Sequence, residues 1–205
     1  MKKTLKHKKH PPKGSVKERI IDTAIRLLSE KGVSETAMLD IARASFTDHQ
    51  LVYYYFPSIT RLHYEVVMRI MNELKGAMLE GIIEHGGNAR HDMEKYITST
   101  FEWARNNPGR MSLWIFFYYK ASTGGEFKTL NDAFRRTGRE RIGALVAKGV
   151  GDGVYKRLNA DAIRAVSTQI QGLITGNAIM AATESGIDHM DFAAKTYKTV
   201  MGMLI

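Results

Sequence analysis

The stretch from Thr36 to Leu62, TAMLDIARASFTDHQLVYYYFPSITRL, constrains the fold of this chain more than any other part of the sequence. Thr36 and Asp48 are suitable helix N-caps, and each precedes a short run with apolar residues at helical spacing. The Phe56-Pro57 pair is expected to end the second run, because a residue before proline disfavours the helical conformation. The stretch therefore predicts two short helices joined by a turn, a helix-turn-helix.

The rest of the chain also has the periodicity of helices. Ser15 begins a capping box, and the helix that follows it is expected to end at Gly32. Ser58 is placed to cap a longer helix that runs to about Glu84. No stretch alternates with period two for long enough to form a strand, so we predict an all-α protein. Further helices are expected over residues 89–106, 109–122, 126–148, 160–184 and 189–205.

Positive charge is concentrated at the start of the chain. Residues 1–14 contain six lysines and no acidic residue, and removing these six charges from the net charge of +9 leaves +3. With Pro11, Pro12 and little apolar surface, residues 1–14 are expected to be a disordered basic arm suited to a polyanion. The remainder is expected to divide into a helix-turn-helix domain over 15–62 and a larger helical domain over 63–205.

Several classes of function are excluded by what the sequence lacks. There is no cysteine, so disulfides, thiolate metal sites and cysteine nucleophiles are ruled out. Neither G-x-S-x-G nor H-E-x-x-H occurs, and we expect no catalytic residue, metal or cofactor. Gly149–Gly153 is interpreted as a turn rather than a phosphate-binding loop, and the histidines of 7–10 are not expected to hold a metal.

The location of the protein is predicted from its apolar segments. The N-terminus has no apolar segment of the kind found in secretory signals. The most apolar run, Met111–Tyr119, is too short to span a bilayer. We therefore expect a soluble, cytoplasmic protein with no membrane partner.

The second helix of the helix-turn-helix carries side chains suited to contacting DNA. Gln50 can pair bidentately with adenine, and Leu51 can contact a thymine methyl group. Tyrosine hydroxyls and the free amides of a helix N-terminus suit phosphates. Packing within the protein is an equal alternative for Tyr54 and Tyr55. The candidate DNA-binding residues are Thr36, Thr47, Asp48, His49, Gln50, Leu51, Tyr53, Tyr54, Tyr55 and Ser58.

Over about residues 15–65 the chain resembles the N-terminal DNA-binding domain of the TetR family of transcriptional regulators. Three positions depart from the family pattern: Phe46 replaces the turn glycine, Leu39 a frequent arginine and Ile59 a lysine. Beyond residue 65 the chain resembles the family only in the layout of its expected helices, not in sequence motifs. The matching residues are Thr36, Ile41, Ala42, Val52, Tyr53, Tyr55, Phe56, Ser58 and Leu62.

The resemblance implies a repressor that leaves a palindromic operator in double-stranded DNA when a small-molecule effector binds its C-terminal domain. It also implies a homodimer, for which the last two expected helices, with their apolar faces and small residues, are the candidate interface. The concentration of aromatic residues favours a hydrophobic or aromatic effector, with core packing as the alternative for each residue. The candidate effector-binding residues are Phe101, Trp103, Met111, Trp114, Phe117 and Tyr118.

A second function stays open at this point. Because Leu39, Phe46 and Ile59 remove polarity or flexibility from the expected DNA face, the chain is also compatible with a helical regulator that binds a ligand or protein. In that case, sequence-specific DNA binding would be weakened or lost. Salt dependence separates the two, because purely electrostatic attachment has a steep salt slope and no sequence preference.

Overall fold

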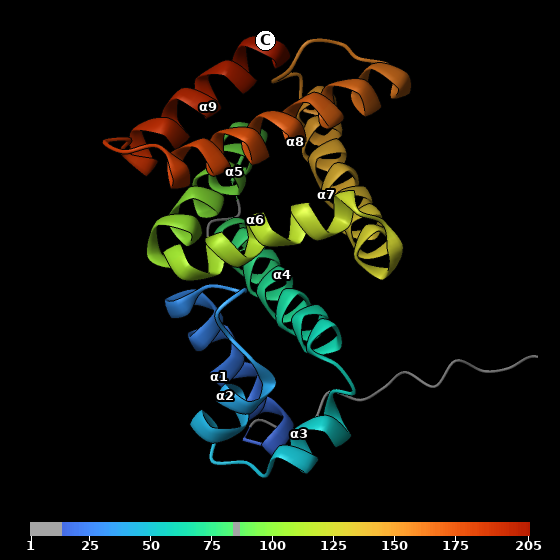
Figure 1. The fold of residues 1–205 in the computed structure, drawn as a ribbon. Helices are drawn as coiled ribbons and strands as arrows, with labels where there is room; N and C mark the ends of the chain where they lie inside the picture. The colour runs from blue at the N-terminus through green and yellow to red at the C-terminus, as the bar shows by residue number, and fades with distance from the viewer. Residues whose placement is uncertain (1–13, 84–86) are drawn as a thin grey trace, which may run out of the picture. The chain divides into compact units, whose positions relative to one another are not determined.

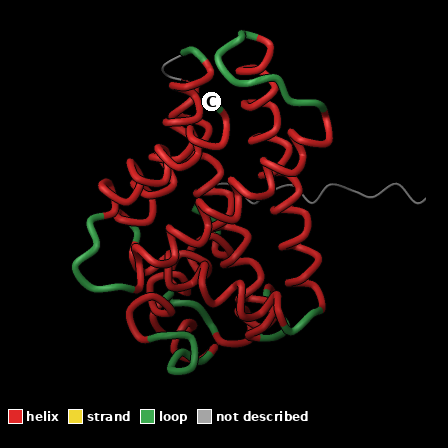
Figure 2. Tube along the Cα trace, turned by 90° about the horizontal axis from the view of Figure 1, so that it is seen from above, coloured by secondary structure: helices red, strands yellow, loops and turns green. Residues whose placement is uncertain are grey.

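The computed structural model describes residues 14–83 and 87–205, and this part of the chain contains α-helices and no strand (Figures 1 and 2). The prediction of an all-α protein is confirmed. The expected basic arm lies outside the described residues, apart from Gly14. The helices are α1 (Val16–Lys31), α2 (Met38–Ala44), α3 (His49–Tyr55), α4 (Ile59–Ile83), α5 (Ala89–Asn106), α6 (Pro108–Ser122), α7 (Gly125–Gly151), α8 (Ala160–Thr183) and α9 (His189–Leu204).

The chain forms two compact units, and the division falls between Met68 and Arg69, within α4. In the first unit, α2 packs against both α1 and α3. Its core is apolar and fully buried, so three short helices are held together by shared burial rather than by their own stability. The residues of this core with no exposed surface include Ile20, Ala24, Ile41, Val52, Phe56 and Leu62.

Helix starts in the first unit follow the expected caps with one exception. The Ser15 hydroxyl accepts from the amide of Glu18, and the Asp48 carboxylate accepts from the amide of Gln50. The Ser58 hydroxyl accepts from the amide of Arg61 at the start of α4. The prediction that Thr36 caps the second helix is wrong, because the cap is Ala37, whose amide donates to the Asp40 carboxylate.

In the second unit, α5 packs against α9, α7 against both α6 and α8, and α8 against α9. Figure 1 shows α8 and α9 running alongside one another. Among the described residues, no helix has the length and apolar character needed to cross a membrane. The large residues buried without exposed surface include Phe101, Met111 and Phe117.

The end of α7 differs from the prediction, because the helix continues past Lys148 to Gly151. Gly149 lies under the ring of Tyr155, and a Cβ atom at Gly149 would come within 2.1 Å of that ring. The carbonyl of Gly149 accepts from the amides of Val154 and Tyr155, which turns the chain back. Residues 149–153 are therefore a helix end and a turn, as interpreted, and the glycine serves close packing.

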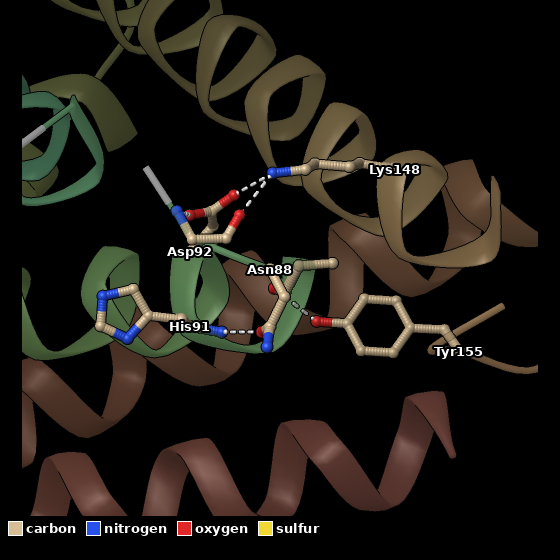
Figure 3. A network of polar contacts seen from close by, with 7 residues as sticks. Asn88, His91, Asp92, Lys148 and Tyr155 are labelled. Atoms are coloured by element: carbon tan, nitrogen blue, oxygen red, sulfur yellow. Dashed lines mark hydrogen bonds and ion pairs between the residues drawn. The ribbon is translucent and has the colours of Figure 1, made fainter. Parts of the chain in front are cut away.

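Polar contacts join the start of α5 to the end of α7 (Figure 3). Lys148 Nζ donates to the Asp92 carboxylate at 2.5 Å and to the Gly87 carbonyl at 3.0 Å. The Tyr155 hydroxyl donates to the Ala89 carbonyl at 2.8 Å, and burial raises the pKa of Tyr155 to about 12. The phenol therefore stays protonated at neutral pH and keeps this hydrogen bond.

Candidate nucleic-acid interface and effector site

The turn between α2 and α3 contains a residue in a strained conformation. Phe46 has φ of +50°, and it is the only residue other than glycine with positive φ in the described part of the chain. Its side chain is 93% exposed, so no packing offsets the strain. For an L-residue this conformation costs about 1–2 kcal/mol.

The turn is held from α1 by Arg19, a residue that sequence reasoning missed. Arg19 Nε donates to the Ser45 carbonyl at 2.9 Å, and its Nη2 lies 3.5 Å from Thr47 Oγ1. The Thr47 hydroxyl also donates to the Ser45 carbonyl, and the Ser45 hydroxyl donates to the Ala42 carbonyl. These bonds fix the approach of α3 to α2 despite the strain at Phe46.

Replacing Phe46 with glycine is expected to raise the free energy of unfolding by about 1 kcal/mol. The gain is the relief of the positive φ, less about 0.5–1 kcal/mol for the greater freedom of glycine in the unfolded chain. Urea unfolding followed by circular dichroism measures it. Phe46→Ala is the control, because alanine keeps the Cβ atom and the strain. An equal gain in the alanine variant would assign the effect to the exposed ring instead.

Helix α3 presents almost all of its side chains to solvent. Val52 is its only buried residue. Asp48 is engaged in capping, since its carboxylate accepts from the Gln50 amide at 2.8 Å. One of the amides that would meet a phosphate at this helix N-terminus is therefore already bonded to a carboxylate. Of the predicted DNA-binding residues, the exposed ones are Asp48, His49, Gln50, Leu51, Tyr53, Tyr54 and Ser58, with Thr47 and Tyr55 partly exposed.

Thr36 does not share this exposed face. It is 5% exposed, and its hydroxyl donates to the Gly32 carbonyl at 2.9 Å. Its hydroxyl thus stabilises the connection between α1 and α2, and the prediction that it contacts DNA is corrected on this ground.

The aromatic side chains of α3 are arranged in pairs. The rings of His49 and Tyr53 meet edge to face with their centres 4.7 Å apart. Those of Tyr54 and Tyr55 lie 5.4 Å apart, and Tyr54 is 78% exposed. The pairing limits the freedom of the rings before any ligand binds, which lowers the entropic cost of a contact.

An open hollow of about 620 Å³ borders this face. Leu39 and Ile59, two of the departures from the family pattern, line it together with His49 and Tyr53. Leu39 is 42% exposed. These apolar side chains therefore lie on the same side of the unit as the start of α3 rather than in its core.

The predicted effector-binding residues fall into two groups. Phe101, Met111 and Phe117 have no exposed surface and belong to the core, and Trp103 is 7% exposed. Trp114 and Tyr118 differ from them, because the buried Nε1 of one and the buried hydroxyl of the other have no hydrogen-bond partner. Buried polar atoms without partners are rare in native proteins and call for an explanation.

Sequence reasoning missed the polar residues on α7 and α8 that lie beside Tyr118. The Arg135 guanidinium lies 5.5 Å from the centre of the Tyr118 ring and donates to Thr175 Oγ1 at 3.0 Å. Asn131, one turn earlier on α7, has a buried side-chain oxygen without a partner. The aromatic residues alone drew attention in the sequence, because arginines on a helix usually face solvent.

Comparisons with known proteins agree with this geometry. Residues 20–65 match the sequence profile described as "Bacterial regulatory proteins, tetR family". The HTH-type transcriptional regulator BetI of Agrobacterium fabrum is 23% identical over 156 residues, covering 69% of this chain and 75% of the relative. BetI of Brucella canis is 25% identical over 169 residues, covering 74% and 84%.

Solved structures share the fold over more than nine-tenths of the chain. A transcriptional regulator from Saccharomonospora viridis in complex with choline superposes with a TM-score of 0.79 at 17% identity, covering 92% of this chain and 96% of that one. A TetR transcription regulator from Haloarcula marismortui has a TM-score of 0.78 at 15% identity, covering 93% and 98%.

The helix-turn-helix and the larger helical unit after it define the class of protein, a helix-turn-helix transcriptional regulator. More specifically, residues 20–65 match the DNA-binding domain of the TetR family of bacterial regulators, and the chain shares its fold with solved TetR regulators. The family and the neighbours consist of regulators rather than enzymes, in agreement with the sequence analysis.

Proposed function

We propose that this chain is a repressor that binds a palindromic operator as a homodimer and leaves it when a small organic effector binds the second unit. The observation that carries the proposal is the exposure of α3, which has one buried residue and presents Gln50, Leu51 and Tyr54 outward. A helix that buries one residue and exposes polar side chains at its N-terminal end is suited to insertion into a major groove.

Exposed small residues on α8 support dimerisation. Gly172 and Gly176 are exposed, and a Cβ atom at either would meet nothing within 4 Å. Met180 continues this stripe and is 42% exposed. Small residues allow a second copy of the helix to approach closely, and α9 beside α8 would complete a two-fold four-helix interface.

The mechanism follows from the geometry of DNA. Two copies of α3 must be about 34 Å apart to enter successive major grooves on one side of the duplex. Helix α4 contains residues of both units, so an effector that moves α4 changes that spacing. Effector and operator then weaken each other's binding by the same factor.

Fluorescence anisotropy with DNA from upstream of the protein's own gene tests the proposal, with scrambled DNA as the control across a salt series. A preference that survives moderate salt supports a sequence-reading repressor. Equal, salt-sensitive binding to both DNAs would favour the alternative, a helical regulator with weakened DNA recognition at Leu39, Phe46 and Ile59.

Replacing Gln50 with alanine is expected to reduce binding to the preferred DNA by about tenfold and to relax the preference at one base pair, because a bidentate contact to adenine is lost. Anisotropy against a set of single-base variants of the bound DNA measures the preference. Asn72→Ala, at an exposed amide residue outside α3 and outside the proposed dimer interface, is the matched control and should leave base preference unchanged. A uniform loss across all variants would show that Gln50 contacts the backbone instead.

A further inference from the structure

Buried polar atoms without partners occur on α6 and α7, two helices that pack against each other. Trp114 Nε1 and the Tyr118 hydroxyl come from α6, and their rings are 5.4 Å apart. The Asn131 side-chain oxygen comes from α7. An indole N–H is a donor only, and a phenol donates readily, so the two groups on α6 lack an acceptor, whereas the Asn131 oxygen lacks a donor.

The Tyr118 hydroxyl is available to act as a donor at neutral pH. Burial raises the pKa of Tyr118 above its usual value, and the nearby Arg135 only partly opposes the rise. The Thr175 hydroxyl, which accepts a hydrogen bond from Arg135 Nη1, lies beside the phenol and lowers its pKa. The phenol keeps its proton, and its buried oxygen has no hydrogen-bond partner of good geometry.

The charge around this group is positive. Arg135 is partly buried over the Tyr118 ring, and Arg139, one turn later, has its Nη1 3.5 Å from the Gln171 side-chain oxygen. No carboxylate pairs with either arginine among residues 14–83 and 87–205. In the same part of the chain Asp92 is the only buried acid, and it is paired with Lys148. A partly buried positive charge without a carboxylate partner favours an anion beside it.

From these observations we propose that the effector of this protein is an organic carboxylate with an apolar body. Its carboxylate accepts from Trp114 Nε1, the Tyr118 hydroxyl and the Arg135 guanidinium, and its body packs against the aromatic residues of α6. Arginine is suited to this role because its planar fork matches a carboxylate. The proposal rests on the proposed function, whose effector it assigns to a chemical class.

The same arrangement disfavours a quaternary ammonium such as choline, which a structural neighbour contains. Aromatic rings do attract such cations. Here, however, a guanidinium already lies against the Tyr118 ring, and the described interior offers no free carboxylate to balance a second positive charge.

Binding of a matched panel tests the proposal. The panel contains phenylacetate, 4-phenylbutyrate and octanoate, the primary alcohol corresponding to each acid, and choline. Isothermal titration calorimetry on the full chain gives affinities, and thermal melting reports stabilisation independently. In a Trp103→Phe variant, Trp114 is the remaining tryptophan, and its emission shows whether the ligand reaches this group. We expect at least one acid to bind 10- to 100-fold more tightly than its alcohol and to shift the Trp114 emission.

Two variants and a control test which side chains produce the preference for the acid over the alcohol. Arg135→Gln should remove the preference for acid over alcohol, and Tyr118→Phe should reduce affinity for the acid several-fold. Arg136→Gln, an exposed neighbour on the same helix, is the control and should bind the acid normally. A melting curve of each unliganded variant establishes that it is folded. Equal affinity for acids and alcohols, binding of choline alone, or no binding of any acid overturns the proposal.

The inference and the proposed function fail in different ways. If an acid binds and shifts Trp114 but never alters DNA affinity, the carboxylate site stands and the effector-controlled repressor does not. If choline releases the protein from its DNA while Trp114 emission stays constant, the proposed function stands and the carboxylate site is wrong.

Discussion

Replacing Gly149 with alanine is expected to lower the free energy of unfolding by about 3 kcal/mol and the melting temperature by about 10 °C. The new Cβ atom would lie 2.1 Å from a ring carbon of Tyr155, well inside van der Waals contact. The ring cannot move aside freely, because its hydroxyl is bonded to the Ala89 carbonyl and it is 4% exposed. Thermal and urea unfolding followed by circular dichroism measure the loss.

Gly143 provides the matched control on the same helix. A Cβ atom there would meet Ser167 Oγ at 3.5 Å, an ordinary contact, so Gly143→Ala should stabilise the protein by up to about 1 kcal/mol through helix propensity. In a Tyr155→Ala background, Gly149→Ala should lose its cost. Similar effects of the two glycine substitutions in the natural background would mean that the Tyr155 ring is not the obstacle.

Deleting residues 2–13 is expected to weaken binding to every DNA sequence by about 100-fold or more at low salt. The described residues of the first unit, 14–68, contain six Lys and Arg against seven Asp and Glu, a net charge of −1. The six lysines of the deleted segment therefore supply most of the attraction to phosphates. If every lysine neutralises a phosphate, the salt slope should fall by roughly 5 per chain.

The readout is anisotropy with specific and scrambled DNA across a salt series. A variant with the six lysines replaced by arginine is the control and should keep the slope, because the charge is unchanged. Preference for the specific DNA should survive the deletion, since the proposed function assigns base contacts to α3. An unchanged slope after deletion would show that the segment takes no part in binding.

Local signals in the sequence predicted most of the fold. Helix caps act within one turn, so Ser15, Asp48 and Ser58 marked three helix starts correctly. The prediction that Thr36 caps α2 failed because its hydroxyl donates to the Gly32 carbonyl at the end of α1. That contact depends on the tertiary path of the chain. The end of α7 failed for a similar reason, since Gly149 is required by the Tyr155 ring rather than by a helix stop.

The candidate site was predicted less completely than the fold. Phe46 was placed in the turn from the family pattern, and its positive φ agrees with that placement. Arg19 and Arg135 were missed, because each acts on a residue at least 17 positions away along the chain. No periodicity connects such pairs, so only the packed structure brings them together.

In α3, the residue that holds the helix in the fold is different from the residues that are available for contact with DNA. Val52 anchors the helix, and the outward residues around it make little contact with the core of the unit. Substitutions on that outward face should change which DNA is bound at small cost to stability, generally within about 0.5 kcal/mol each. Under the proposed function, a few changes in one seven-residue helix would give the protein a new operator while the rest of the fold is retained.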